Sequence, residues 1–231
     1  MSTFSRVDKP FEYDSFEEAR RAAVDSAATS GARLFPCVVF WQGGRTMIST
    51  SFPLLVATRQ IKTDSSKKGE SARSSTNRPI IPEHVNTIQR YLKTNREQYI
   101  LPPLTLNVKE MPKLFIEKGN QSVRMGFLSI GDETSFYVTD GQHRLRAIEG
   151  VLEQDRELGR DGIAVMIVVE KDIAQIHQDF ADAAQTKAIP ASLLAVYNTR
   201  EPVNKALYAI VENSKLLNGR IDETSQDQKI T

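Results

Sequence analysis

The apolar positions along the chain alternate between the spacing of a helix and the spacing of a strand. Phe16, Ala19 and Ala23 recur at helical intervals with acidic residues early in the stretch, which predicts a short helix over residues 15–30. Apolar and β-branched residues on both sides of Gly43-Gly44 predict a β-hairpin. The same criteria predict strands over residues 34–41, 46–52, 104–108, 122–130, 135–139 and 163–169, and helices from Pro82 onward and over residues 144–157, 173–184, 190–198 and 203–217.

This mixture of elements predicts an α/β fold with a mixed β-sheet flanked by helices. Residues 163–169 form a nearly continuous apolar run, which is typical of a strand buried on both faces. No internal repeat and no clear boundary divides the chain, so a single domain over residues 1–231 is expected. The serine-rich stretch at residues 65–76 is the best candidate for a seam, and residues 218–231 form a polar tail.

The composition is that of an ordinary globular protein, since 40% of the 231 residues are hydrophobic and 26% are charged. The formal net charge of +1 neither requires nor excludes a nucleic-acid partner, because a basic patch can exist within a neutral total. Cys37 is the only cysteine, which excludes an intrachain disulfide and a cysteine-ligated metal cluster. No apolar run approaches the roughly 20 residues of a membrane helix, and the polar N-terminus lacks a secretory signal. A cytoplasmic protein with no membrane partner is therefore expected.

Residues 59–93 are the most basic stretch of the chain. Their first part, residues 61–77, is rich in serine and lysine and is predicted to be an exposed loop. Cationic side chains on such a loop can become ordered against the phosphates of a duplex. The alternative is a solvated loop without a partner, which is the commoner role of a charge-rich segment. The residues predicted to contact nucleic acid are Arg59, Lys62, Lys67, Lys68 and Arg73.

The clearest chemical signal is the segment Asp140-Gly141-Gln142-His143-Arg144, which lies where a strand gives way to a helix. Asp140 is expected to cap the helix by accepting backbone N–H groups, and Gly141 to permit a tight turn. The first turn of a helix has free N–H groups and the positive end of the helix dipole, which favour an anion. Arg144 adds a guanidinium suited to phosphate, so the segment predicts a phosphate site.

Two side chains extend this prediction. Arg146 would supply a second charge, and His143 would donate to a phosphate oxygen or transfer a proton. The alternative interpretation is an ordinary strand–helix junction, in which Asp140 is only a cap and His143 and Arg144 are solvated. Two known phosphate loops are excluded, because the segment has no Gly-Lys-Ser/Thr sequence and its glycine spacing does not fit a dinucleotide-binding turn.

The sequence Asp-Gly-Gln-His-Arg, followed by Leu-Arg-Ala-Ile, resembles the DGQHR-domain proteins, and most closely the DndB family of DNA phosphorothioation (sulfur modification) gene clusters. Two further segments resemble the family, at residues 77–104 and 180–190, in the same order along the chain. The resemblance spans roughly residues 35–217, and three ordered segments are stronger than one short motif.

The resemblance implies a single ParB-like DGQHR domain, related to sulfiredoxin, in which the acidic-glycine turn binds nucleotide phosphates. It implies a DNA-binding transcriptional regulator that represses its own gene cluster. The expected partners are double-stranded promoter DNA and other sulfur-modification proteins, with a homo-oligomer left open. ATP or GTP with Mg²⁺ is the implied cofactor, and no structural metal is expected. The implied nucleotide-binding residues are Gly141, Gln142, Arg144, Arg146, Arg78 and Gln185.

An enzyme is the second hypothesis that the resemblance raises, namely a nucleoside triphosphatase (ATPase) with DNA-nicking activity. Its catalytic residues would be Asp140, His143 and Arg144: Asp140 would hold magnesium, together with Asp182, while His143 would assist proton transfer and Arg144 would hold phosphate charge. Sulfiredoxin chemistry is not expected, because Gln142 stands where sulfiredoxins carry their reactive cysteine. A scaffold that docks onto other modification proteins is a third option. The family is usually longer than 231 residues, which raises the expectation of a truncated member.

Overall fold

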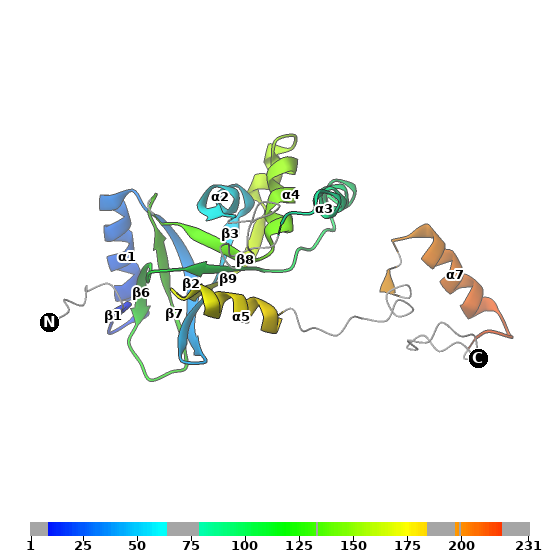
Figure 1. The fold of residues 1–231 in the computed structure, drawn as a ribbon. Coiled ribbons are helices and arrows are strands. Elements are labelled where there is room, and N and C mark those ends of the chain that lie inside the picture. Colours follow the sequence, from blue (N-terminus) through cyan, green and yellow to red (C-terminus); the bar gives the residue numbers. More distant parts are fainter. Residues whose placement is uncertain (1–8, 64–78, 133, 184–196, 199, 219–231) are drawn as a thin grey trace. The chain divides into compact units, whose positions relative to one another are not determined.

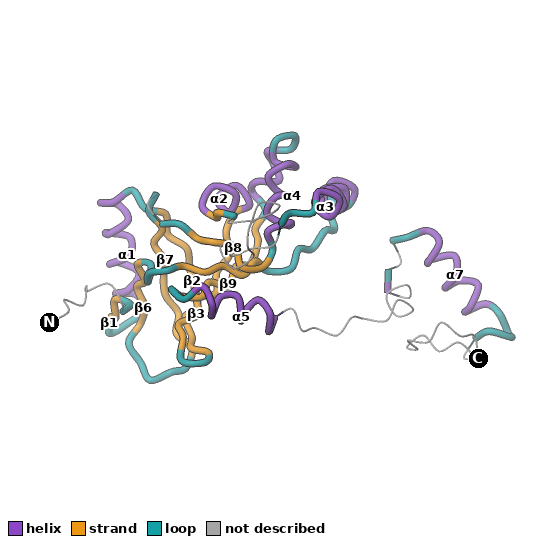
Figure 2. The backbone as a smooth tube through the Cα atoms, in the orientation of Figure 1, coloured by secondary structure: helices purple, strands orange, loops and turns teal. Residues whose placement is uncertain are grey.

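The computed structural model describes residues 9–63, 79–132, 134–183, 197–198 and 200–218. The chain divides into two compact units, Met1–Asp182 and Ala183–Thr231. The seam predicted at residues 65–76, most of the helix predicted at residues 190–198 and nearly all of the predicted polar tail lie outside the described residues. Figures 1 and 2 show the sheet and helices of the first unit, and helix α7 (Pro202–Asn213) of the second.

A nine-stranded sheet forms the centre of the first unit, with the strand order β1-β6-β7-β2-β3-β9-β5-β8-β4. Its strands are β1 (Phe11–Tyr13), β2 (Arg33–Gln42), β3 (Arg45–Pro53), β4 (Ile61–Lys62), β5 (Leu104–Val108), β6 (Lys113–Glu117), β7 (Val123–Ile130), β8 (Phe136–Asp140) and β9 (Gly162–Val169). The pairs β1–β6, β5–β9 and β4–β8 are parallel, and the other neighbours are antiparallel. The expected α/β fold with a mixed sheet is therefore confirmed.

Helices cover both faces of this sheet (Figure 1). They are α1 (Phe16–Ser30), α2 (Leu54–Gln60), α3 (Pro82–Thr94), α4 (Gln142–Leu152) and α5 (Ile173–Ala183), with the 3-10 helix η1 (Arg156–Arg160) after α4. Successive residues of a strand point to opposite faces, so Leu34 and Phe35 of β2 belong to different layers. Phe35 lies in the main core with residues of α2, α3 and α4. Leu34 packs on the other face, in the cluster formed by Ala19 and Ala23 of α1.

Local signals explain where the elements begin. Ser15 caps α1, because its side chain accepts the backbone N–H of Glu18 at 3.2 Å. Pro82 occupies the first turn of α3, where its missing N–H breaks no intrahelical bond. Gly43 and Gly44 both have positive φ angles, 59° and 75°, which the tight turn between β2 and β3 requires. The predicted hairpin is confirmed.

The structure also corrects several predicted boundaries. Ile61 and Lys62 lie in the predicted exposed loop, but the structure places them in strand β4, and Ile61 is buried. The helix predicted over residues 144–157 begins at Gln142 and ends at Leu152, and η1 follows as a separate turn. Helix α2 and strands β1 and β6 were not predicted. They are too short for the spacing of their apolar residues to reveal a period.

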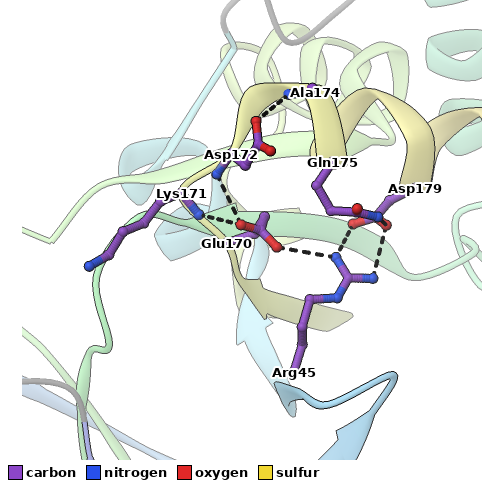
Figure 3. Close-up of polar contacts among 7 residues, drawn as sticks. All are labelled: Arg45, Glu170, Lys171, Asp172, Ala174, Gln175 and Asp179. Atoms are coloured by element: carbon purple, nitrogen blue, oxygen red, sulfur yellow. Dashed lines mark hydrogen bonds and ion pairs between the residues drawn. The ribbon is translucent and has the colours of Figure 1, made fainter.

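One cluster of ion pairs fastens α5 to the sheet (Figure 3). Arg45, at the start of β3, donates from Nη1 to Asp179 Oδ2 at 2.6 Å and from Nη2 to Asp179 Oδ1 at 2.9 Å. Its Nη1 also lies 3.5 Å from Glu170 Oε2, just beyond β9. The hydrogen bonds from Arg45, assisted by one from Gln175, hold the pKa of Asp179 below its ordinary value. Both outer nitrogens of this guanidinium are therefore occupied by carboxylates.

The same cluster forms the start of α5 (Figure 3). Glu170 Oε1 accepts the backbone N–H groups of Lys171 and Asp172, at 2.8 and 2.9 Å. Asp172 Oδ1 accepts the backbone N–H of Ala174 at 2.9 Å. The bond to Ala174 satisfies a first-turn N–H that has no partner inside the helix, and the other two fix the backbone just before α5. Together with the buried side chain of Ile176, they make α5 dependent on a small number of contacts.

Helix α7 of the second unit begins at Pro202 and presents several apolar side chains to solvent, among them Val203, Leu207 and Ile210. None of its residues is buried within the described part of the chain. Across the described residues, no helix combines the length and the apolar character needed to cross a bilayer.

Candidate functional site

The predicted phosphate segment lies at the junction between β8 and α4. Strand β8 ends at Asp140 and α4 begins at Gln142. Gly141 joins them with a φ angle of 105°, a conformation that residues with a side chain rarely adopt. A Cβ atom at this position would overlap the Leu104 side chain and lie 2.9 Å from Arg144 Nη2. Glycine therefore allows the backbone to approach the Arg144 guanidinium closely.

Asp140 does not cap α4, and that part of the prediction is wrong. Gly141 occupies the cap position, and no side chain there bonds to the first N–H groups of the helix. Asp140 is still part of β8, so it lies one residue too early to reach those groups. Its exposed carboxylate instead accepts a bond of 2.7 Å from Arg144 Nη2, four residues along the chain. The acid and the cation of the segment are thus paired with each other.

Arg144 is held by few groups for a side chain that is only 18% exposed. Its Nη2 donates to Asp140 and to the backbone carbonyl of Pro103, at 2.7 and 3.1 Å. Its Nε is buried and has no hydrogen-bond partner in the part of the chain that the structure describes. Among the described residues, its Nη1 has none either. A guanidinium carries five N–H donors, so Arg144 retains hydrogen-bonding capacity that an anion could satisfy.

His143 and Gln142 both turn inward, which sequence reasoning did not anticipate. Each is only 5% exposed. His143 Nε2 accepts the backbone N–H of Ile81 at 3.0 Å, just before α3 begins, so this nitrogen carries no proton. The exposed ring of His84 lies against it, with centroids 4.9 Å apart. His143 therefore joins α4 to the start of α3, and using Nε2 in proton transfer would require this bond to break.

Arg146 links the junction to the basic edge of the sheet. Its Nη1 pairs with Glu149 at 2.8 Å, and its Nη2 donates to Thr63 Oγ1 at 3.3 Å. Thr63 directly follows β4, the edge strand that carries the exposed Lys62. Lys62 is paired across the strands with Tyr137 of β8. A residue predicted to bind a nucleotide and one predicted to bind DNA therefore lie on adjoining elements.

Arg59 is, besides Lys62, the other residue predicted to contact nucleic acid that the structure describes. It is exposed in the last turn of α2. It lines a groove of about 700 Å³ together with residues of α2, α4 and the start of η1. This groove also contains Arg156, Glu149 and Glu153, so its two cations face two acids. The groove has no excess of positive charge, and Arg59 is a weaker phosphate candidate than Lys62.

Several predicted residues lie outside the described part of the chain. They are Lys67, Lys68, Arg73, Arg78 and Gln185. Asp182, the expected second magnesium ligand, is exposed on α5 and accepts a bond from Gln178 at 2.7 Å. Within the described residues, no group of three or more histidine, cysteine, aspartate or glutamate side chains could hold a metal ion. Asp140 is therefore not part of a cluster of three or more such side chains among these residues.

The lone cysteine lies far from this chemistry. Cys37 is buried in β2, and burial raises the pKa of its thiol to about 12. A thiol that stays protonated at neutral pH is a poor nucleophile. Its environment is therefore that of an inert core residue.

Sequence reasoning missed the groups that hold the junction in place. These are the Pro103 carbonyl, the Ile81 N–H and the Thr63 hydroxyl, all of which come from distant parts of the chain. No local pattern marks a backbone group as a partner. The only usable signals were the Pro102-Pro103 pair before β5 and Pro82 after Ile81, which mark chain segments of restricted conformation.

Comparison with known proteins places this site in a family. The family model for DndB, described as DNA-sulfur modification-associated, matches residues 35–229, which include the whole junction between β8 and α4. No curated protein and no solved structure matches the chain. Because the family model covers most of the sequence, the chain belongs to the DndB family of DNA-sulfur modification-associated proteins.

Proposed function

We propose that this protein is a DNA-binding transcriptional regulator of a DNA phosphorothioation gene cluster. The observation that carries the proposal is Arg144, whose guanidinium stands at the start of α4 with a buried Nε that no group of the described residues satisfies. Membership of a family associated with DNA sulfur modification supplies the biological setting. Contacts with other sulfur-modification proteins and self-association belong to the same proposal.

A phosphate would bind at the junction through two kinds of donor. The start of α4 offers the positive end of the helix dipole. Arg144 offers Nη1, and it can turn toward an anion once Asp140 gives up part of its bond to Nη2. Asp140 therefore tunes the site, since a phosphate must compete with its carboxylate for the guanidinium. This competition favours a dianionic or multiply contacted phosphate over a weak single contact.

The edge of the sheet would supply the remaining contacts to a duplex. Lys62 and Arg146 lie on adjoining elements beside Thr63, and Lys62 is exposed. Cations in this position neutralise backbone phosphates without reading the bases. The basic residues predicted at 67, 68 and 73 follow in the same chain segment. They would extend the contact with the DNA backbone.

Control by a nucleotide is a further part of the proposal. The phosphates of ATP or GTP would take the place of a DNA phosphate at the start of α4 beside Arg144, with Arg146 beyond them. Magnesium would arrive with the nucleotide and meet Asp140, because magnesium takes few protein ligands in such sites. This part depends on the ParB-like fold, which stays a prediction.

The competing hypothesis is a nucleoside triphosphatase with DNA-nicking activity. The buried His143, whose Nε2 is engaged by the Ile81 N–H, supports binding rather than proton transfer. The test is phosphate release from ATP or GTP in the presence of Mg²⁺ or Mn²⁺, together with nicking of supercoiled plasmid. If the wild type turns over nucleotide, and if His143→Ala folds but has lost this activity, the enzyme hypothesis replaces the regulator hypothesis.

The experiment that tests the regulator is a mobility shift with the promoter fragment of its own gene cluster. Wild type should bind this fragment more tightly than random DNA of the same length. Arg144→Gln should weaken binding about tenfold, since a phosphate contact of this kind contributes roughly 1–2 kcal/mol. The matched control is Arg20→Gln, which removes an arginine paired with Glu17 on the exposed side of α1. Equal affinity for promoter and random DNA, or an unaffected Arg144→Gln, would contradict the proposal.

A further inference from the structure

A second pocket lies in the half of the sheet that does not carry α4. It is formed around β1, the end of β2 and the start of β7, and it has a volume of about 460 Å³. Lys9, Glu12, Trp41, Met111 and Arg124 are among its lining residues. That volume falls within the range of about 300–1,000 Å³ usual for small-molecule sites. Nothing in the role proposed for the α4 junction uses this pocket.

Arg124 is the central group of the pocket. Its side chain is 10% exposed, and its Nη1 donates to Glu12 Oε1 at 2.6 Å. Its Nε is buried, and no residue from 9 onward that the structure describes bonds to it. Among the described residues, the bond to Glu12 is the only hydrogen bond of this guanidinium. A buried cation with so few bonds is unfavourable in the free protein, and an anion in the pocket would relieve that cost.

Trp41 gives the pocket an aromatic wall. Val39 is paired with Arg124 across β2 and β7, so Trp41, two residues further along β2, shares the face of the sheet with Arg124. The guanidinium carbon of Arg124 lies 4.6 Å from the centre of the indole ring. Yet Trp41 remains 41% exposed, although an apolar strand residue of this size is expected in the core. The structure thus leaves a large aromatic surface open beside a cation.

The charges of the pocket select the ligand. Lys9 and Arg124 outweigh the single acid Glu12, so the pocket favours an anion. An exposed indole backed by a guanidinium favours a planar ring, because bases stack on both kinds of surface. We infer that this pocket binds a phosphorylated nucleoside unit, with the base against Trp41 and the phosphate held by Arg124 and Lys9. The unit can be a free mononucleotide or an unpaired nucleotide of a DNA strand.

The chain provides its own reporter, because Trp41 is its only tryptophan. Full-length protein is titrated with dTMP, thymidine, inorganic phosphate, glutamate and a short single-stranded oligonucleotide while the fluorescence of Trp41 is recorded. We expect saturable quenching by dTMP, with thymidine, phosphate and glutamate each binding at least about tenfold more weakly. An oligonucleotide that binds more tightly than dTMP identifies a DNA strand as the source of the unit, and the reverse order identifies a free nucleotide.

Three variants test the assignment of the atoms. Arg124→Lys keeps the charge but loses the planar fork, and should weaken dTMP binding about fivefold or more. Lys9→Ala should weaken it less, because Lys9 is exposed. Glu12→Gln should tighten it, because the carboxylate that competes for Nη1 is gone.

A control separates this site from the α4 junction. Arg144→Gln should leave the quenching by dTMP unchanged, so failure of this inference and failure of the proposed regulator are distinguishable. No saturable quenching, equal affinity for thymidine and dTMP, or an unaltered affinity in Arg124→Lys would each overturn the inference. Tight binding of glutamate would overturn it too, since that result describes an unselective anion site. If Arg124→Lys folds poorly, the dTMP affinities of Glu12→Gln and Lys9→Ala still test the inference.

Discussion

Two arginines of this molecule, Arg45 and Arg144, face carboxylates in very different ways. Arg45 engages both oxygens of Asp179 through its two outer nitrogens and lies 3.5 Å from Glu170 as well (Figure 3). Arg144 reaches one oxygen of Asp140 and one backbone carbonyl, both through the same nitrogen. Its Nε is buried with no partner among the residues described. Both outer nitrogens of Arg45 thus have carboxylate partners, whereas only one outer nitrogen of Arg144 has a partner among the described residues.

The difference separates an arginine that holds the fold from one that is suited to a ligand. The partners of Arg45 come from the end of β9 and from α5, so their bonds join distant parts of the chain. The acid of Arg144 is four residues away, and that pair contributes little to tertiary structure. Arg124 belongs with Arg144, because within the described residues it makes one hydrogen bond and its Nε has no partner. Unused donors on a mostly buried guanidinium are therefore the more useful guide to a binding site than charge alone.

The strongest test of this comparison is Gly141→Ala, which disturbs the support of Arg144 without altering its charge. The new Cβ would overlap Leu104 and crowd Arg144 Nη2 in a backbone conformation that alanine disfavours. We expect a loss of about 3 kcal/mol in the free energy of unfolding, measured by urea denaturation. The control is Gly119→Ala, since the nearest atom to a Cβ there is 3.9 Å away. Equal stability of the two variants would refute the account of this junction.

The next largest effect should come from exchanging the two arginines for glutamine. Arg45→Gln leaves Asp179 and Glu170 without their shared cation and should lower the free energy of unfolding by about 1–2 kcal/mol. Hydrogen exchange should rise most in α5, which the cluster holds to the sheet. Arg144→Gln should cost less than about 1 kcal/mol, because its acid is exposed and can be solvated. If Arg144→Gln proved the more damaging of the two for stability, the division into structural and ligand-binding arginines would be wrong.

The sequence predicted the frame around Arg144 more fully than its contacts. The alternation of apolar positions identified β8, β9 and α4, and the Asp-Gly step identified the place where strand becomes helix. Those features depend on neighbours in the chain, so local patterns contain them. The predicted helix cap at Asp140 is wrong, because Gly141 occupies the cap position in the left-handed conformation and Asp140 remains in strand β8. One residue of offset converted an expected cap into an ion pair.

Other parts of the site could not be predicted, because their partners are far apart in sequence. The bond from Ile81 to His143 spans 62 residues, and the clamp from Arg45 to Asp179 spans 134. No spacing rule connects such positions. Ile61 of β4 was missed for a related reason, since a two-residue strand is defined by its pairing with β8 rather than by its own pattern. Tertiary pairing decided these contacts.

Acid should weaken the Arg45 clamp, because one of its carboxylates is Asp179. The pKa of Asp179 is lowered mainly by its hydrogen bonds with Arg45, so the folded state favours its charged form. The stabilisation is fully present above the ordinary carboxyl pKa, and it is lost as the pH falls through the lowered value.

This pH effect is measured by hydrogen exchange of the α5 amides, corrected for the intrinsic exchange rate at each pH. The range runs from neutral pH to about pH 3, which is near the range where aspartate titrates. Asp179→Asn is the control. It removes the titration, so its α5 should respond less to pH than the α5 of the wild type. An identical response in both proteins would show that another group controls the helix.

The smallest expected difference between the two arginines lies in the salt dependence of DNA binding. Each phosphate contact lowers the slope of log K against log salt by about 0.9. Arg144→Gln should therefore reduce the magnitude of the slope by about one unit, and Lys62→Ala should do the same. Arg45→Gln should leave the slope unchanged, because both outer nitrogens are occupied by carboxylates. Lys113→Ala, an exposed lysine on β6 in the other half of the sheet, is the matched control for Lys62. A slope that changed equally in all four variants would show that net charge, and not the position of the cations, governs binding.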